Sequence, residues 1–380
     1  PDNNAVARDT VVGPPRHLQW VGAPAWTRNH HKLNSISSVV TAKGRLFFIV
    51  DEATASNMSV PGKWRLVARD AFSGVVLWKK PMKSWAWHQI RFRSGPPQVT
   101  RLLVVSDDRL YAPLGLSEPV SEMDAVTGKT LRTFEGTAGA EEIVLVDGTL
   151  LVLRGEPVAA QAVGHVDFKG RMQGPNKKSV VAVQAGTGKV LWTCADPGAD
   201  VRPETLASDG KQVYYQVGEG VACLELKFGK KLWTSGTTPP KAGGAKPKAA
   251  KGKKRRTGSA FGKSVLVVSN GVVLCNLGNQ LTALSAENGK KLWSCPGGAG
   301  FHAPLDLFVV DGLVWRGNHP KDSVSPPPVD DFSEGRDLRT GAVKKKNRIM
   351  VDLQTSGHHH RCYRGKACLL YTSDAADDLA

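Results

Sequence analysis

Residues Val181 to Trp192, VAVQAGTGKVLW, contain the pattern that the rest of the chain repeats. A β-rich run is followed by a tight turn closed by Thr187-Gly188, and a second β-rich run ends at Trp192. A glycine can adopt the positive φ that a bulged hairpin turn requires, and a tryptophan offers a large apolar face with one N–H donor. The pattern therefore predicts a β-hairpin that packs through its final tryptophan.

The same frame recurs along the chain, and in four copies the tryptophan follows the turn glycine by four residues. Arg132 stands at this position in one copy, which predicts a weaker junction there. The glycines of the frame are Gly74, Gly128, Gly188, Gly229, Gly289 and Gly341, and its tryptophans are Trp78, Trp192, Trp233 and Trp293. We expect these residues to be structural, because a repeat at a fixed offset is typical of repeat architectures.

A second type of turn alternates with the first. It is a short polar turn between two β-rich runs, found at Lys43-Gly44, Asp107-Asp108, Asp147-Gly148, Asp209-Gly210, Asn270-Gly271 and Asp311-Gly312. Asp-Gly and Asn-Gly between such runs are strong hairpin signals. Each unit thus contains four antiparallel strands, and this predicts an all-β propeller with six recognisable blades, at about 35–80, 100–136, 141–195, 203–236, 263–296 and 305–350.

The distances between turns predict where the chain varies in length. The two turn glycines of a unit are 18 positions apart in blade 5, at Gly271 and Gly289, but 40 positions apart in blade 3, at Gly148 and Gly188. The extra residues must lie between the second and third strands, or between blades. Both connections leave the same end of an up-and-down sheet, so we expect every long segment, including 84–97, 157–178, 237–262 and 319–332, on one face. Such loops usually carry binding residues.

Composition limits the classes of protein that fit. The chain has 380 residues and a net charge of +17, and it has no apolar run of membrane-spanning length. Eight basic residues lie in 237–262, which we expect to be a disordered insertion; binding of nucleic acid through this tract is the alternative. The six cysteines form no CxxC pair, and we expect buried free thiols.

The frame Asp-x-x-Thr-Gly-Lys-x-x-Trp resembles the repeat of pyrroloquinoline-quinone-type (PQQ-like) propellers over roughly residues 35–350. Quinoprotein alcohol dehydrogenases, the lipoprotein of the β-barrel assembly machinery and large bacterial extracytoplasmic proteins share this repeat. Residues 3–20 and 357–364 are most similar to the last group. The resemblance implies seven or eight blades in the intact protein and a location in the periplasm or cell envelope.

Two functions are compatible with the resemblance. We favour a non-enzymatic, monomeric scaffold that binds a protein or polymer through its loop-rich face, with no nucleic acid expected. The alternative is a quinoprotein-type oxidoreductase that binds pyrroloquinoline quinone and calcium. Such enzymes are expected to have adjacent cysteines and a Glu, Asn and Asp calcium site, and this chain has no adjacent cysteines.

Two segments outside the repeats are candidates for binding. On a strand, His358, His360 and Cys362 would share one face, and imidazole and thiolate suit zinc or copper; a polar strand of the next blade is the alternative. Residues 84–97 combine Trp85, Trp87, His88 and three further large side chains, either for packing on a neighbouring blade or for binding an anionic ligand.

The ends of the chain differ from its repeats. We expect an N-terminal extension at 1–34, the propeller at 35–367 and a non-native tail at 368–380. The sequence begins with Pro1 rather than Met and is expected to be a fragment without its signal peptide.

Overall fold

The structure is a computed structural model, and it describes residues 20–21, 36–53, 63–83, 101–115, 118–155, 178–195, 201–202, 205–236, 265–277, 280–296, 306–317 and 332–348. Its described residues form twenty-four strands and one short 3-10 helix, η3 (Glu135–Thr137). The strands make six four-stranded sheets in which each strand pairs with the next along the chain. The predicted all-β propeller is thereby confirmed. The described residues include no helix that is long and apolar enough to cross a membrane.

The blades are numbered in chain order. Blades 1 to 3 contain β1 (Ile36–Ala42), β2 (Arg45–Asp51), β3 (Trp64–Asp70), β4 (Val76–Pro81); β5 (Val104–Ser106), β6 (Arg109–Pro113), β7 (Val120–Asp124), β8 (Thr130–Phe134); β9 (Ala140–Val146), β10 (Thr149–Arg154), β11 (Ser179–Gln184), β12 (Val190–Ala195). Blades 4 to 6 contain β13 (Ala207–Ser208), β14 (Gln212–Val217), β15 (Gly220–Glu225), β16 (Lys231–Ser235); β17 (Leu266–Ser269), β18 (Val272–Leu277), β19 (Gln280–Ser285), β20 (Lys291–Pro296); β21 (Asp306–Val310), β22 (Leu313–Gly317), β23 (Phe332–Asp337), β24 (Val343–Arg348).

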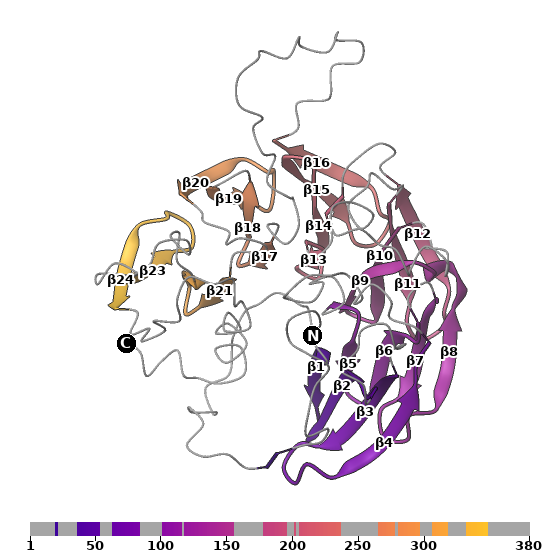
Figure 1. The fold of residues 1–380 in the computed structure, drawn as a ribbon. Coiled ribbons are helices and arrows are strands. Elements are labelled where there is room, and N and C mark those ends of the chain that lie inside the picture. Colours follow the sequence, from indigo (N-terminus) through magenta and orange to yellow (C-terminus); the bar gives the residue numbers. More distant parts are fainter. Residues whose placement is uncertain are drawn as a thin grey trace, which may run out of the picture.

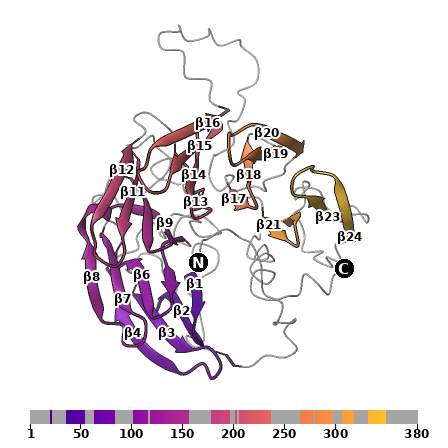
Figure 2. The same cartoon turned by 180° about the vertical axis from the view of Figure 1, so that it is seen from behind.

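The blades are arranged around a common centre (Figures 1 and 2). The first strand of each blade is innermost, and first strands of neighbouring blades contact one another from β1 and β5 through to β17 and β21. The fourth strand of each blade lies on the outside of the arc, as β4, β8, β12, β16, β20 and β24 do in Figure 1.

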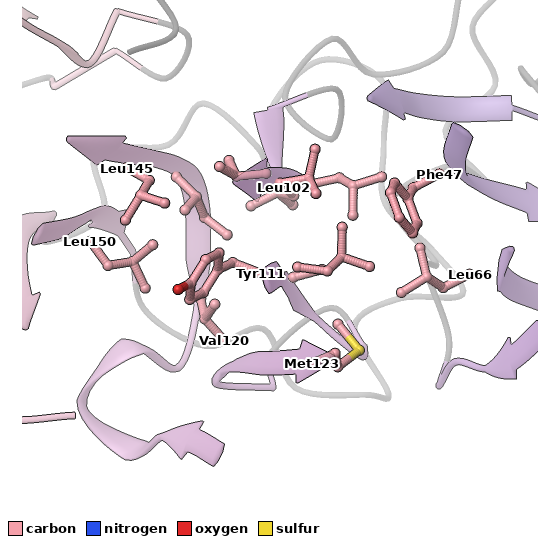
Figure 3. Packing of buried hydrophobic residues seen from close by; sticks show 14 of the residues in the cluster. Phe47, Leu66, Leu102, Tyr111, Val120, Met123, Leu145 and Leu150 are labelled. Carbon is pink, nitrogen blue, oxygen red and sulfur yellow. The ribbon is translucent and has the colours of Figure 1, made fainter. Parts of the chain in front are cut away.

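The apolar core lies between the faces of neighbouring sheets. Its largest cluster joins blades 1 to 3 through residues that include Phe47, Leu66, Tyr111, Met123 and Leu145 (Figure 3). Three further clusters join blades 3 and 4, blades 4 and 5, and blades 5 and 6. Because blades 2 to 5 each pack against a neighbour on both faces, their inner strands are almost continuously apolar rather than alternating.

The turns between first and second strands have the predicted geometry. In four blades a residue with positive φ precedes a glycine with positive φ, for example Asp147 (φ 46°) and Gly148 (φ 70°). A two-residue turn of this kind fits the right-handed twist of a hairpin. Blade 4 differs, because its turn is longer. Ser208 pairs with Val213, so four residues separate the paired positions, whereas two separate Val146 from Thr149 in blade 3.

Candidate binding face and blade junctions

Each sheet has two distinct ends. The turn end contains the tight turns between first and second strands and between third and fourth strands, such as Lys43-Gly44 and Asp70 to Gly74. The loop end contains the connections between second and third strands and between blades. In blade 1 the register places Ile36 opposite Val50, Val50 opposite Arg65 and Arg65 opposite Pro81, so all four strand termini meet at the loop end.

The same register applies to the strands that flank the long segments. β10 ends at Arg154, opposite both Ala140 and Ser179, and Ser179 lies opposite Ala195. Residues 84–97, 157–177, 237–262 and 319–331 lie outside the described residues. Their common face therefore stays a prediction, which rests on the strand ends to which they connect.

Buried polar contacts fix these strand ends. Asp51, at the end of β2, is buried, and its Oδ1 accepts hydrogen bonds from the backbone N–H groups of Ala53 (3.0 Å) and Lys63 (2.7 Å). These two bonds close the base of the connection between β2 and β3. In blade 3, Lys178 Nζ lies 2.8 Å from Glu141 Oε2, and both side chains are buried. Breaking a buried pair is costly, since it leaves one charge without its partner.

Glu142 links three blades at the loop end. Its side chain is fully buried on β9 of blade 3. Arg101, just before β5 of blade 2, donates from Nη1 to Glu142 Oε1 at 2.6 Å. The backbone N–H of Leu206, just before β13 of blade 4, donates to Glu142 Oε2 at 3.0 Å. The carboxylate thus holds three inner strands in register, and both of its oxygens are engaged by protein groups.

The described residues do not form a metal site. They contain no group of three His, Cys, Asp or Glu side chains that could hold a metal ion. Glu142 is enclosed by Arg101 and Leu206, so it does not fit a calcium ligand. The predicted metal ligands His358, His360 and Cys362 lie outside the described residues, so this metal site stays a prediction.

The described cysteines are free thiols: Cys194, Cys223, Cys275 and Cys295. Burial raises the pKa of Cys223 to about 12, with a further contribution from the charge of Asp209, and burial alone raises the pKa of Cys275 to about 12. The thiolate is the nucleophile and the metal ligand, so these two thiols are unsuited to either role at neutral pH.

The repeat tryptophans join neighbouring blades. The indole N–H of Trp192 in blade 3 donates to the carbonyl of Leu226 in blade 4 at 2.8 Å. Its ring covers Gly229, where a Cβ would meet Trp192 Cδ2 at 2.5 Å, and Gly229 has a φ of 68°. Glycine is required there both by its backbone conformation and by the ring above it. Equivalent hydrogen bonds run from Trp78 to Ala125, from Trp233 to Ala286 and from Trp293 to Leu338.

Arg132 occupies the same place at the junction of blades 2 and 3. Its Nη1 donates to the carbonyl of Ala185 at 2.7 Å, and its Cδ lies over Gly188. Arg132 Nε also lies 3.8 Å from Glu122 Oε2. The guanidinium therefore reproduces the hydrogen bond of the indole, while its thinner side chain covers the glycine less tightly.

Trp20 makes a further junction that the sequence pattern did not reveal. Its indole N–H donates to the carbonyl of Ala71 at 2.9 Å. Its ring covers Gly74, where a Cβ would lie 2.5 Å from Trp20 Cδ2. The guanidinium carbon of Arg69 lies 5.7 Å from the centre of the Trp20 ring. The repeated frame did not identify Trp20, because the residue four positions before Trp20 is Arg16 and not a glycine.

Three of the turns beneath these rings are closed by an aspartate. Asp124 Oδ1, for example, accepts hydrogen bonds from the Thr127 N–H (2.7 Å), the Thr127 hydroxyl (2.9 Å) and the Val126 N–H (3.0 Å). Bonds from Ser73, Thr127 and Thr340 lower the pKa values of Asp70, Asp124 and Asp337 respectively. Hydrogen bonds to a carboxylate favour its charged form.

Several solved structures are similar to this chain. No curated protein matches the chain. Among solved structures, BamB from Moraxella catarrhalis is similar at 12% identity, with a TM-score of 0.48 and coverage of 83% of this chain and 74% of that one. A europium-containing methanol dehydrogenase has 12% identity, a TM-score of 0.50 and coverage of 87% and 72%. A quinohemoprotein alcohol dehydrogenase from Comamonas testosteroni has 13% identity, a TM-score of 0.48 and coverage of 85% and 62%.

A family model described as outer membrane protein assembly factor BamB matches residues 19–192, 63–247 and 176–318. These overlapping matches together span most of the chain. The chain therefore belongs to this family of PQQ-like β-propeller repeat proteins.

Proposed function

We propose that this protein is a non-enzymatic scaffold that binds a protein or polymer through the loop end of its blades. The observation that carries the proposal is the contrast between the two ends. The turn end is built from tight turns, and three aspartates close turns on it with their own hydrogen bonds. The loop end bears the connections of variable length, and these begin at strand ends that Asp51, Glu141 and Glu142 hold in place.

A rigid base under variable connections suits recognition. Loops on a fixed scaffold can differ between blades without disturbing the sheets, because few core contacts depend on them. The family description, an outer membrane protein assembly factor, supports a protein partner and a location outside the cytoplasm, in the periplasm or cell envelope.

A quinoprotein-type oxidoreductase is the second candidate. The likeness to the europium-containing methanol dehydrogenase favours it, although at 12% identity this likeness concerns the fold alone. Function depends on the site rather than on the fold. The enclosed carboxylate of Glu142 and the buried thiols of Cys223 and Cys275 argue for the scaffold, since none of these groups is available to a quinone or a metal.

Reconstitution with quinone separates the two candidates. The purified chain is incubated with pyrroloquinoline quinone and calcium, and dye reduction is followed with a panel of alcohols beside a quinoprotein dehydrogenase as the positive control. Retention of the quinone is measured separately by ultrafiltration. The scaffold proposal predicts neither retention nor dye reduction, and quinone-dependent turnover would overturn it.

A further inference from the structure

The outer edge of blades 4 to 6 is strongly basic. The strands β16, β20 and β24, together with the turns before β16 and β20, carry eight exposed lysines: Lys227, Lys230, Lys231, Lys290, Lys291, Lys344, Lys345 and Lys346. The three strands contain no Asp or Glu. Of the acidic residues in their turns, Asp337 is bonded to its own turn through Oδ1. We call this set of eight lysines the basic arc.

Three cations on the outer strands of blades 1 and 2 have partners within the protein. Lys79 Nζ lies 2.6 Å from Glu52 Oε1, Lys80 Nζ donates to the carbonyl of Gly128 at 2.9 Å, and Arg132 donates to Ala185. Within the described ranges, Lys230, Lys290, Lys291, Lys345 and Lys346 take part in no ion pair. These side chains of the basic arc are therefore available to an external anion.

Protection of exposed sheet edges does not account for the basic arc. Lysines on edge strands oppose pairing between molecules. The outer strand β12, with the sequence VLWTCA, is equally an edge and carries no charged residue. Since β12 has no charge, an outer strand of this ring does not need lysines to protect its edge. We therefore attribute the lysines on three consecutive blades to the binding of a ligand.

The apolar residues of this surface limit the class of ligand. Leu232 and Leu292 are exposed among the lysines, whereas the rings of Trp233 and Trp293 lie over Gly289 and Gly341. Phe228 is the one exposed aromatic ring among the described residues of these three turns and strands. Single-stranded nucleic acid is bound through several stacked aromatic side chains. The surface therefore fits a polyanion that is recognised by charge and not by base stacking.

The curvature of this surface favours a flexible chain. β16, β20 and β24 lie on the outside of successive blades, so the strands that carry these lysines follow a convex arc (Figures 1 and 2). A flat bilayer would contact the edge of one blade at a time, whereas a flexible polymer can follow the arc. Lysine is a mobile point charge that does not require a fixed bidentate geometry. We propose that the basic arc binds a linear anionic polysaccharide, at a surface distinct from the loop end.

Binding to heparin, a linear sulfated glycan, tests the proposal. Anisotropy of labelled heparin is measured with the full chain at several NaCl concentrations. Each lysine that contacts the polymer releases counterions, so the slope of log Kd against log salt should fall by about 2 in the Lys230→Gln/Lys290→Gln variant. Lys129→Gln/Lys189→Gln is the matched control, because these exposed lysines hold the same turn position in blades 2 and 3. It should leave the slope unchanged.

Two further measurements decide the outcome. A variant in which the eight basic residues of 237–262 are replaced by glutamine should keep the dependence on Lys230 and Lys290. Heparin should also protect the lysines of the basic arc from acylation in the unmodified chain, as read by mass spectrometry. Equal effects of the two lysine pairs, dependence on 237–262 alone, or tighter binding of a single-stranded oligonucleotide or of anionic vesicles would overturn the proposal.

Discussion

Replacing Gly229 by alanine tests whether the tryptophan above it constrains the blade junction. Gly229 has a φ of 68°, and a Cβ would lie 2.5 Å from Trp192. Gly148 has nearly the same φ, 70°, but a Cβ there would meet nothing within 4 Å. The left-handed backbone costs alanine about 1–2 kcal/mol at either site. Displacing the packed ring should cost about 1–3 kcal/mol more at Gly229 alone.

The assay is urea unfolding followed by circular dichroism, with hydrogen exchange at β15 and β16 as a local readout, because long repeat arrays need not unfold in one step. A double-mutant cycle with Trp192→Ala isolates the contact. Once the ring is absent, Gly229→Ala should destabilise no more than Gly148→Ala does. Equal effects of Gly229→Ala and Gly148→Ala in the unmodified chain would refute the reasoning, since backbone strain alone would then explain the loss of stability.

Three other outcomes are expected. Trp192→Ala should lower the free energy of unfolding by about 3–5 kcal/mol, and Arg132→Ala by about 1–2 kcal/mol. The loss is smaller for Arg132 because its half-exposed guanidinium buries less apolar surface. Equal losses in urea unfolding would contradict this. The pKa values of Asp70, Asp124 and Asp337 are lowered by hydrogen bonds from Ser73, Thr127 and Thr340, so their stabilisation is present above the unfolded-state pKa and is lost as pH falls through the folded-state pKa. The triple Asp→Asn variant should therefore have a lower Tm than the parent at pH 7 and the same Tm at pH 2, and a constant difference would argue against it. Cys223 and Cys275, whose pKa values are raised to about 12, should react with a thiol reagent at pH 8 only after denaturation, and rapid reaction of the native chain would show that they are accessible.

The repeated frame was enough to predict the blades because each hairpin is specified locally. The turn of blade 2 is closed by hydrogen bonds within it, from Thr127 to Asp124 and from Gly128 to Asp124. A register shift lies beside this turn in the pairing of β7 with β8, between Glu122 and Met123. The exceptions follow from the same logic. Trp20 has no turn glycine four residues before it, and the glycine that its ring covers, Gly74, lies in blade 1.

The contacts at the loop end could not be predicted from the sequence. Arg101, Glu142 and Leu206 meet although they lie far apart in the chain and belong to no common motif. Their association depends on the packing of three blades around the centre. Arg132 is a similar case: its change from tryptophan is visible in the sequence, but its hydrogen bond to Ala185 becomes evident only when blades 2 and 3 are in contact.

Site-specific photo-crosslinking tests most directly whether the loop end is the binding face. A photoreactive residue replaces Lys83, Glu118 or Glu219 at the loop end, or Asp147, Thr187 or Glu287 at the turn end; all six are exposed or half-exposed. The variants are expressed in the source cells, irradiated and compared for covalent adducts. We predict that one recurring adduct forms from the three loop-end positions and from none of the turn-end positions. The same adduct from both ends, or from the turn end alone, would contradict the account.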